Sequence, residues 1–480
     1  MPELASLPRA PLKRFAFRLA SGALNGLCRL PGHPERPLAR LAAKRIIGDM
    51  APLGDVAGGE AIRVLGFSTS RSRQDFLMLA NSPDIDVFEA PNGVVQAINS
   101  LFATRPLLPP RTPYHYWQER DQGILAARER LGRFLREVLA QMKEIGRIDC
   151  IVTPAAHYEY QIPWAASADA IGLPFVAIHK EFTVLGERHF HVRLETLKAR
   201  NLRFPGTAVL VANQRAKRLF AAAGVAPSER IVVTGLPRMD RLFAAEGPFR
   251  TKAARTRKQV ALFSFGHYAG GLGSAGPSRS KLFSANDDHG FVRLFDQVHG
   301  TIGRLAIAHP EVDFKIKPKS VEDWWVSEIE RAVEAATGRP MVDISNCEAV
   351  DGDAAALIRD SDAVIGFGST VLLEARILGV PTVIPVFAEA VDTYPDNVYL
   401  ADELDIFRVA TSPEDLVDAI EEIVSGTFRD ETSRARRSEV FCDYLGFDDD
   451  GSTERVRGAI VAIAKKAGRA GNANATEAGV

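Results

Sequence analysis

The stretch Asp362-Ala-Val-Ile-Gly-Phe-Gly-Ser-Thr-Val-Leu-Leu-Glu-Ala-Arg-Ile-Leu-Gly-Val-Pro-Thr-Val-Ile-Pro385 decides the fold. It predicts a buried strand, a glycine turn, a helix that opens at Ser369-Thr370 and a second apolar strand. We expect the helix to end at Gly379, because Pro381 lies just beyond it. A hydroxyl at a helix start caps backbone N–H groups, and the glycines let another group approach the main chain. Two interpretations remain open: an anion-binding turn, or an ordinary capped strand–helix–strand unit.

Composition indicates an ordinary globular protein. The chain has 480 residues, 46% of them hydrophobic and 25% charged, with a net charge of -1. The length predicts two or three domains, and the charge gives no sign of a nucleic-acid partner. Its four cysteines are far apart, which argues against a zinc site or a disulfide framework and fits a reducing cytosol. No apolar run approaches the ~20 residues of a membrane span, so we expect a cytoplasmic protein.

Short apolar strands alternate with helices along the chain. This alternation is typical of parallel, doubly wound sheets, and it predicts an α/β fold with two Rossmann-like domains that face a cleft. The predicted divisions are a basic N-terminal helical extension (1–60), a first α/β domain (61–246), a linker (247–258), a second α/β domain (259–460) and a disordered tail (461–480).

The N-terminal segment is strongly basic. Between Arg9 and Arg45 there are nine basic residues, and Glu35 is the only acidic one. Leu12, Phe15 and their neighbours recur at helical spacing. The segment is therefore either a peripheral helix on an anionic inner-membrane surface or a solvated helix packed on the body of the protein.

Candidate site residues follow the predicted strands. In doubly wound sheets, ligands bind at the carboxyl ends of the strands. The polar groups that follow predicted strands here are Ser68 to Arg73, His157, His179-Lys180-Glu181, Arg238 to Asp240, His267, Lys317-Pro-Lys319 and Gly368 to Glu374.

Each of these groups has a functional and a structural interpretation. Lys317 and Lys319 can hold a phosphate or form a solvated basic corner. His157 and His179 can act as a general base, although a lone histidine is more often a structural hydrogen-bonding group. Glu181 is a base or the ion-pair partner of Lys180.

Arg238 and Asp240 follow a Gly-x-Pro turn, and for them we favour an internal salt bridge at the domain junction. The sequence has no Gly-x-x-x-x-Gly-Lys-Ser/Thr loop, no His-Glu-x-x-His pattern and no Cys-x-x-Cys pair. Kinase, nucleoside triphosphatase and zinc hydrolase functions therefore have no support, and we predict no metal ligands.

The run from Gly368 to Pro381, with Glu374 between them, resembles the donor-binding segment of the GT-B glycosyltransferase superfamily. Thr234-Gly-Leu-Pro-Arg-Met-Asp240 is similar to a motif of capsule and teichoic-acid polymer transferases, including CDP-glycerol glycerophosphotransferases. Lys317-Pro-Lys-Ser320 and Asp450-Gly-Ser-Thr-Glu-Arg455 also resemble elements of that group. The resemblance covers about residues 148–456.

The resemblance implies roles for several residues. Ser369, Thr370 and the helix start would meet the donor phosphates, and Glu374 would hold the ribose. The first domain would bind the acceptor and the second the nucleotide donor, with no metal and no cofactor beyond the donor itself. One departure matters: Gly366-Phe-Gly-Ser-Thr370 replaces the family's usual Asp-Tyr-Ser-Ser turn, which favours a nucleotide sugar over a glycerol-phosphate donor.

Three functional hypotheses follow. The leading one is a transferase that moves a sugar, or a polyol phosphate, from a nucleotide-activated donor to a cell-envelope glycan or lipid-linked acceptor. In this hypothesis His157, His179 or Glu181 is the catalytic base. The residues that would bind the donor are Arg238, His267, Lys317, Lys319, Gly368, Ser369, Thr370 and Glu374. The alternatives are a UDP-sugar 2-epimerase of the same fold and a non-catalytic glycan- or nucleotide-sugar-binding partner.

Overall fold

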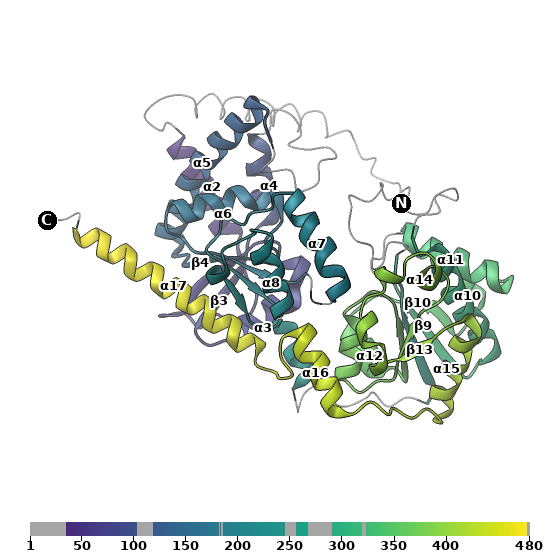
Figure 1. Cartoon of the computed structure of the whole chain (residues 1–480). Helices are drawn as coiled ribbons and strands as arrows, with labels where there is room; N and C mark the ends of the chain where they lie inside the picture. The colour runs from purple at the N-terminus through teal and green to yellow at the C-terminus, as the bar shows by residue number, and fades with distance from the viewer. Residues whose placement is uncertain are drawn as a thin grey trace, which may run out of the picture.

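The computed structural model of this chain describes residues 35–102, 119–181, 183, 186–244, 256–266, 290–318 and 323–477 (Figure 1). Four parts of the sequence-based predictions lie outside these residues: the basic segment up to residue 34, most of the linker, His267 and Lys319.

The first sheet contains seven strands in the order β1-β3-β2-β4-β5-β6-β7. All neighbouring pairs are parallel except β1 with β3, at one edge. The strands are β1 (Ala51–Pro52), β2 (Ile62–Gly66), β3 (Ile85–Glu89), β4 (Cys150–Thr153), β5 (Phe175–His179), β6 (Ala208–Val211) and β7 (Ile231–Val233). The strand order reverses between β2 and β4, which makes this the switch point of the first sheet.

The second sheet contains six parallel strands in the order β10-β9-β8-β11-β12-β13. They are β8 (Lys258–Phe263), β9 (Val312–Lys317), β10 (Cys347–Ala349), β11 (Ala363–Gly366), β12 (Thr382–Pro385) and β13 (Arg408–Ala410). Counted along the chain this is the 3-2-1-4-5-6 order of a dinucleotide-binding sheet, with its switch point between β8 and β11.

Both faces of the first sheet are covered, because alternate strand residues point to opposite faces. Ile151 packs on one side, with α2, α4, α5, α6 and α8. Its neighbours Cys150 and Val152 pack on the other side, with α3 and with α17 (Ser452–Glu477). The helices of this half are α2 (Arg36–Asp49), α3 (Arg73–Ala80), α4 (Asn92–Leu101), α5 (Gln122–Gly146), α6 (Ile162–Ala170), α7 (Glu187–Ala199), α8 (Gln214–Ala222) and α9 (Pro237–Phe243).

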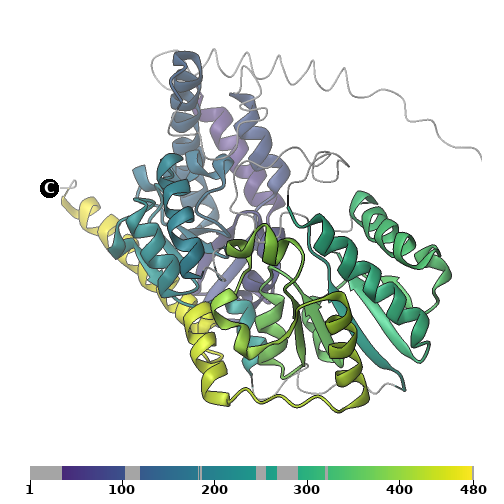
Figure 2. The ribbon, with the colours of Figure 1, turned by 45° about the vertical axis from the view of Figure 1, so that its right-hand side comes forward.

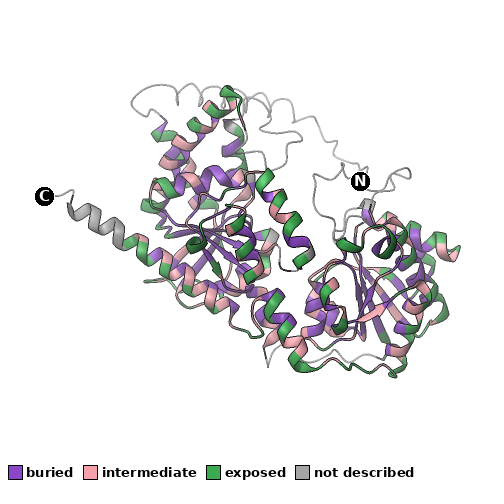
Figure 3. Ribbon diagram, viewed as in Figure 1, coloured by how far each residue is buried: buried purple, intermediate pink, exposed green. Residues whose placement is uncertain are grey.

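The second sheet is covered in the same way. Ile365 faces α10, α11 and α15, whereas Val364 faces α12 and α13. Figure 3 shows both sheets buried between helices whose outer faces are exposed. The helices are α10 (Val292–Ala308), α11 (Asp323–Thr337), α12 (Ala354–Asp360), α13 (Val371–Ile377), α14 (Glu389–Asp392), α15 (Pro413–Ser425), α16 (Arg434–Leu445) and α17 (Ser452–Glu477). These two covered, parallel sheets confirm the predicted fold class of two doubly wound α/β domains.

The C-terminal helix α17 returns to the first sheet. Val456, Ile460 and Ala464 are buried against the same face as Phe76 of α3, and both Figure 1 and Figure 2 show α17 lying along the first domain. The predicted domain divisions stay a prediction, but the structure differs from them at 461–480, where α17 continues through Glu477. The apolar residues up to Ala464 hold the helix on the sheet.

Candidate functional site at the second switch point

The glycine turn of the opening stretch lies at the switch point of the second sheet. β8 ends at Phe263 and β11 at Gly366, and these two residues are register partners. Because the connections from β8 and β11 leave in opposite directions, the loops after them open a space for a ligand. The turn after β11 reaches Gly368, whose φ of +67° lies in the left-handed region that favours glycine.

The two hydroxyls of the turn act differently. Ser369 Oγ accepts a hydrogen bond from the backbone N–H of Val371 at 3.3 Å, as a capping side chain does. Thr370 Oγ1 instead donates to Glu374 Oε1 at 3.1 Å. α13 begins at Val371, and Gly379, with φ +72°, ends its last turn as predicted. The turn therefore orients Glu374 rather than adding a second cap.

Glu374 is a half-buried carboxyl at this switch point. Burial raises the pKa of Glu374, although Arg238 and the Thr370 hydroxyl act in the opposite direction. The carboxyl therefore sits in a desolvated position next to a cation, where a ligand hydroxyl would gain a strong acceptor.

Arg238, on α9, connects the two domains at this point. Its backbone N–H and its Nη1 each donate to the carboxylate of Asp75, both at 2.9 Å. Asp75 belongs to α3 of the first domain and is only 1% exposed. Burial alone would lower the pKa of Arg238, but the carboxylates of Asp75, Glu374 and Glu181 outweigh it and raise that pKa. Glu181 follows β5 and Glu374 follows β11, so a carboxylate after a strand of each sheet acts on the pKa of this guanidinium.

Asp240 has a different partner from the one expected. Asp240 Oδ1 and Oδ2 accept the backbone N–H groups of Ser452 and Thr453, at 2.9 and 2.6 Å, so Asp240 caps the start of α17. The favoured salt bridge between Arg238 and Asp240 is not formed; each side chain binds elsewhere. Residues two apart on a helix point to different sides, so the pair cannot meet once α9 begins at Pro237.

The two motifs that share the family resemblance are therefore structural partners. Thr234 and Gly235 lie against the start of α17: Arg455 Nε donates to the carbonyl of Thr234 at 3.1 Å. A Cβ on Gly235 would lie 2.2 Å from Ser452 Oγ, and its φ is +76°. Glycine is therefore required here by close approach as well as by conformation.

Lys317 ends β9, the strand next to β8. Its Nζ lies 3.5 Å from Asp351 Oδ1, and its side chain is 16% exposed. The Gly352 N–H and then Lys317 lower the pKa of Asp351. Lys317 therefore lies at the predicted edge of the sheet, on the side of β8 away from the glycine turn.

The switch point of the first sheet holds the histidines. His157 follows β4 and is half-buried, with its ring centre 5.4 Å from that of His179. His179 is fully buried, and its Nδ1 accepts the backbone N–H of Ala156 at 3.3 Å. Burial, His157 and Lys180 lower the pKa of His179 well below its usual value, so the ring is neutral. A base that meets an acceptor must be exposed, which favours His157 or Glu181 over His179.

A neutral polar network lies beside these histidines. Ser68, with a left-handed φ of 53°, shares a short hydrogen bond with Tyr160 Oη. Gln161 Nε2 donates to Ser68 Oγ at 3.0 Å, and Thr153 Oγ1 donates to the side-chain oxygen Oε1 of Gln161. The sequence analysis did not identify Tyr160, Gln161 or Asp75. Tyr160 and Gln161 follow β4, so the rule that ligands bind after the carboxyl ends of strands could have identified them. Nothing in the sequence distinguishes Asp75.

The described part of the chain contains neither a membrane-spanning helix nor a metal-binding cluster. None of the described helices is long and apolar enough to cross a membrane. Within the same residues, no group of three or more His, Cys, Asp or Glu side chains is arranged to hold a metal ion.

Comparisons with known proteins were made at three levels. No family model matches the chain, and no curated protein matches it. Among solved structures, the UDP-GlcNAc 2-epimerase from Neisseria meningitidis aligns with 84% of this chain and 99% of its own, at 11% identity and a TM-score of 0.44. A UDP-forming α,α-trehalose-phosphate synthase from Burkholderia xenovorans aligns with 86% and 100%, at 14% identity and a TM-score of 0.41. The wall teichoic acid polymerase TagF aligns with 95% and 98%, at 11% identity and a TM-score of 0.44.

These likenesses are too distant to assign a family or an activity, and the fold class rests on the strand order of the two sheets. The sequence-predicted site residues fall into two groups. In the first group, Glu374 and Glu181 both act on the pKa of Arg238, and Gly368, Ser369 and Thr370 lie in the turn before Glu374. His157 and His179 are adjacent to one another at the first switch point.

Proposed function

We propose that this chain is a GT-B-type glycosyltransferase that moves a sugar from a nucleotide-activated donor to a cell-envelope glycan or lipid-linked acceptor. The observation that carries the proposal is the guanidinium of Arg238, held by Asp75 and coupled to both Glu374 and Glu181. Carboxylates that follow strands of both sheets act on this guanidinium, which supports a site where a donor and an acceptor would meet. A polyol phosphate is the less favoured cargo, because the turn after β11 carries no acid.

The donor side of the proposal uses the second sheet. The nucleotide lies at the β8/β11 switch point, with its diphosphate near Gly368 and Ser369 and its ribose hydroxyls on Glu374. Arg238 and Lys317 supply fixed positive charge toward the phosphates. The raised pKa of Glu374 reflects a desolvated site in which each such contact is strengthened.

The acceptor side uses the first sheet. The acceptor hydroxyl oxygen forms a bond to the anomeric carbon as the bond from that carbon to the donor phosphate oxygen breaks. The hydroxyl proton passes to Glu181 or His157, and the charge of the departing diphosphate is stabilised by Arg238 and Lys317. His179, buried and neutral, supports His157 from behind and does not touch the acceptor.

Turnover with and without an acceptor tests the reaction type. The chain is incubated with UDP-, CDP- and GDP-sugars, and both nucleotide release and the sugar configuration are measured. A transferase releases nucleotide at a rate that rises strongly when an envelope glycan or lipid-linked sugar is added. Epimerisation that proceeds without acceptor would identify the 2-epimerase instead, and donor binding with neither reaction would identify a binding protein.

A further inference from the structure

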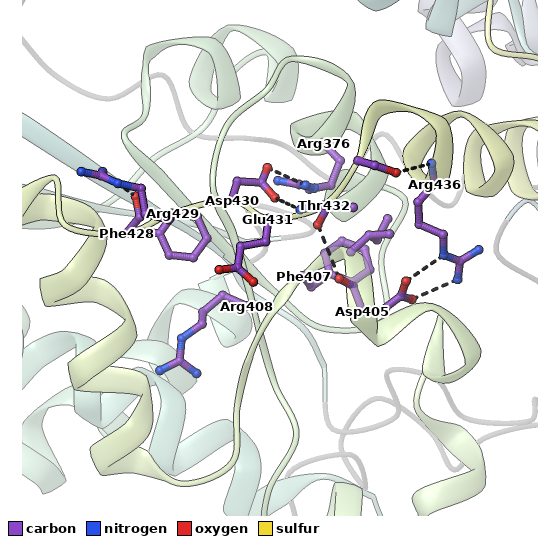
Figure 4. Close-up of a pocket in the computed structure, with 12 residues that line it drawn as sticks. Arg376, Asp405, Phe407, Arg408, Phe428, Arg429, Asp430, Glu431, Thr432 and Arg436 are labelled. Atoms are coloured by element: carbon purple, nitrogen blue, oxygen red, sulfur yellow. Dashed lines mark hydrogen bonds and ion pairs between the residues drawn. The ribbon is translucent and has the colours of Figure 1, made fainter.

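A cavity beside the residues that precede β13 is lined by paired charges (Figure 4). Arg376 pairs with Asp430 and Arg436 pairs with Asp405, each at 2.7 Å. These side chains bind one another and hold the wall of the cavity together. A pair of hydroxyls at the first switch point differs from them, because it keeps a hydrogen that no described side chain accepts.

Ser68 and Tyr160 form this hydroxyl pair. Ser68 follows β2 and Tyr160 follows β4, the neighbouring strands at the switch point of the first sheet. Their oxygens lie 2.5 Å apart, so one hydroxyl hydrogen is shared between them. Gln161 Nε2 donates to both oxygens, at 3.0 and 3.3 Å, while Gln161 Oε1 is taken by Thr153. The pair therefore holds two hydroxyl hydrogens, and its contacts with the described residues use only one of them.

Burial decides which of the two hydrogens is left over. Ser68 is only 4% exposed, and the described residues give its hydroxyl no acceptor other than Tyr160 Oη. A buried donor without an acceptor is costly, so Ser68 donates to Tyr160. Tyr160 is half-buried, and its own hydrogen is then available to a group outside the network.

The remainder of Tyr160 is held in place. Its backbone carbonyl accepts a side-chain N–H of Asn99 at 2.6 Å, and Asn99 Oδ1 accepts the indole N–H of Trp164 at 2.9 Å. Trp164 is fully buried. A donor that is fixed before binding loses little freedom when a ligand arrives, so this hydroxyl suits recognition.

Aromatic rings adjoin this hydroxyl. Tyr158 lies nearly parallel to Tyr160, with the ring centres 5.9 Å apart, and edge-on to His157 at 5.3 Å. Tyr160 and His157 are both half-buried, so part of their ring surface stays accessible. An aromatic surface beside a fixed hydroxyl matches a sugar ring, which has an apolar face and hydroxyl groups at its edge.

Charge at this turn favours an uncharged ligand. Arg73 lies at the start of α3 and Glu89 at the end of β3, and the two pair with each other at 3.5 Å. Thr69 also donates to Glu89. Phosphate groups are bound most strongly by charge-assisted hydrogen bonds, which the neutral side chains of Ser68, Tyr160 and Gln161 do not supply.

We propose that the Tyr160 hydroxyl is the contact that selects an uncharged sugar ring as the acceptor. The hydroxyl donates to a hydroxyl oxygen of that sugar, and the apolar face of the sugar packs on the Tyr160 ring. The inference rests on the proposed transferase function and narrows it, because the acceptor then ends in a sugar rather than in a phosphorylated polyol.

Saturation-transfer NMR on the full chain tests this contact without turnover. The probes are the methyl glycosides of glucose, galactose, mannose and N-acetylglucosamine, with glycerol 3-phosphate as the phosphorylated polyol. We expect saturable binding of at least one glycoside and weaker binding of glycerol 3-phosphate. Saturable binding of glycerol 3-phosphate alone, or of none of the probes, would overturn the proposal.

Variants of Tyr160 separate the hydroxyl from the ring. Tyr160→Phe keeps the ring and removes the donor, so the Kd of the bound glycoside should rise about fivefold. Tyr160→Leu also removes the ring and should raise the Kd further. Tyr399→Phe changes another half-buried tyrosine, in the second domain, and should leave the Kd unchanged. An unchanged Kd in Tyr160→Phe, or an equal rise in Tyr399→Phe, would contradict the proposal even if Tyr160→Leu fails to fold.

Nucleotide binding, measured by thermal stabilisation with UDP, CDP and GDP, separates this inference from the proposed function. Glycoside binding that Tyr160→Phe weakens, without binding of any nucleotide, would support the Tyr160 contact and contradict the proposed donor site. Nucleotide binding together with glycoside binding that Tyr160→Phe does not weaken would leave the transferase proposal standing and overturn the Tyr160 contact.

Discussion

The two switch points of this molecule are built from different chemistry. At the first, Ser68, Tyr160 and Gln161 form a neutral network in which each group binds another. At the second, Arg238 and Glu374 bring charges from both domains to one place. Neutral groups that hydrogen-bond to one another are stable without a ligand. Desolvated charges, in contrast, are stabilised when a charged or hydroxylated ligand binds to them. The comparison teaches that similar sheets can carry different groups: the first switch point holds a network of neutral groups that bind one another, and the second holds desolvated charges.

The largest expected effect comes from removing the cation of the second switch point. Arg238→Gln leaves the carboxylate of Asp75 buried without its counter-ion, and breaking a buried pair costs about 3 kcal/mol. The same change removes the cation next to Glu374, so donor affinity should fall by about 100-fold. Chemical denaturation and calorimetry with the donor measure the two quantities.

Arg241→Gln is the matched control. It lies on the same helix and pairs with Asp353, whose side chain is 37% exposed. We expect a loss of about 1 kcal/mol and a smaller fall in donor affinity than in Arg238→Gln, because Arg241 acts less strongly than Arg238 on the pKa of Glu374. If both substitutions lowered donor affinity equally, Arg238 would have no specific role in binding the donor at the second switch point.

The next effect concerns the helix that ties the domains together. Asp240→Ala removes the acceptor of two backbone N–H groups at the start of α17 and should cost about 1–2 kcal/mol. Hydrogen exchange of the backbone amides of residues 456–464 should become faster, because α17 is held less firmly on the first sheet. Ser412→Ala, which removes the cap of α15 in the second domain, should leave those residues unchanged. Faster exchange there in both variants would argue against a specific role for Asp240.

The smallest effect tests the neutral character of the first switch point. His179 has a lowered pKa in the folded protein, so the unfolded chain binds more protons as the pH falls through the unfolded histidine value of about 6.5. The free energy of unfolding should therefore decrease by up to about 1.4 kcal/mol per pH unit below that value. His179→Gln should make this dependence shallower between pH 6.5 and 5, whereas the exposed control His191→Gln should not. Identical slopes in His179→Gln and the wild type would show that His179 is not held neutral.

Much of the second switch point could be predicted because its signals are local. The continuous apolar run around Val364, the glycine turn and the helix stop at Gly379 all lie within one short segment. Burial of strands on both faces makes such runs continuously apolar, which identifies them without tertiary information. The short edge strands β10 and β13 lacked this signal, since Glu348 and Arg408 keep polar side chains at the surface.

The junction could not be predicted from its local sequence. Asp240 and Ser452 are far apart in the chain, as are Arg238 and Asp75, and only the completed fold brings each pair together. The sequence placed Arg238 and Asp240 in one motif, but helix geometry directs them to separate partners. The return of α17 to the first sheet likewise depends on burial of Val456 and Ile460. Their helical spacing predicts a buried face, but it does not indicate which of the two sheets that face covers.

Nucleotide binding by wild-type protein and Glu374→Ala tests the central claim most directly. Thermal stabilisation is measured against UDP, CDP, GDP and CMP, and a ligand at about 100 times its Kd should stabilise the wild type by about 2.7 kcal/mol. Glu374→Ala should lose most of this stabilisation and keep its fold, while Glu330→Ala, an exposed carboxylate change on α11, should retain it. Undiminished nucleotide stabilisation of Glu374→Ala would contradict the placement of the donor at the second switch point.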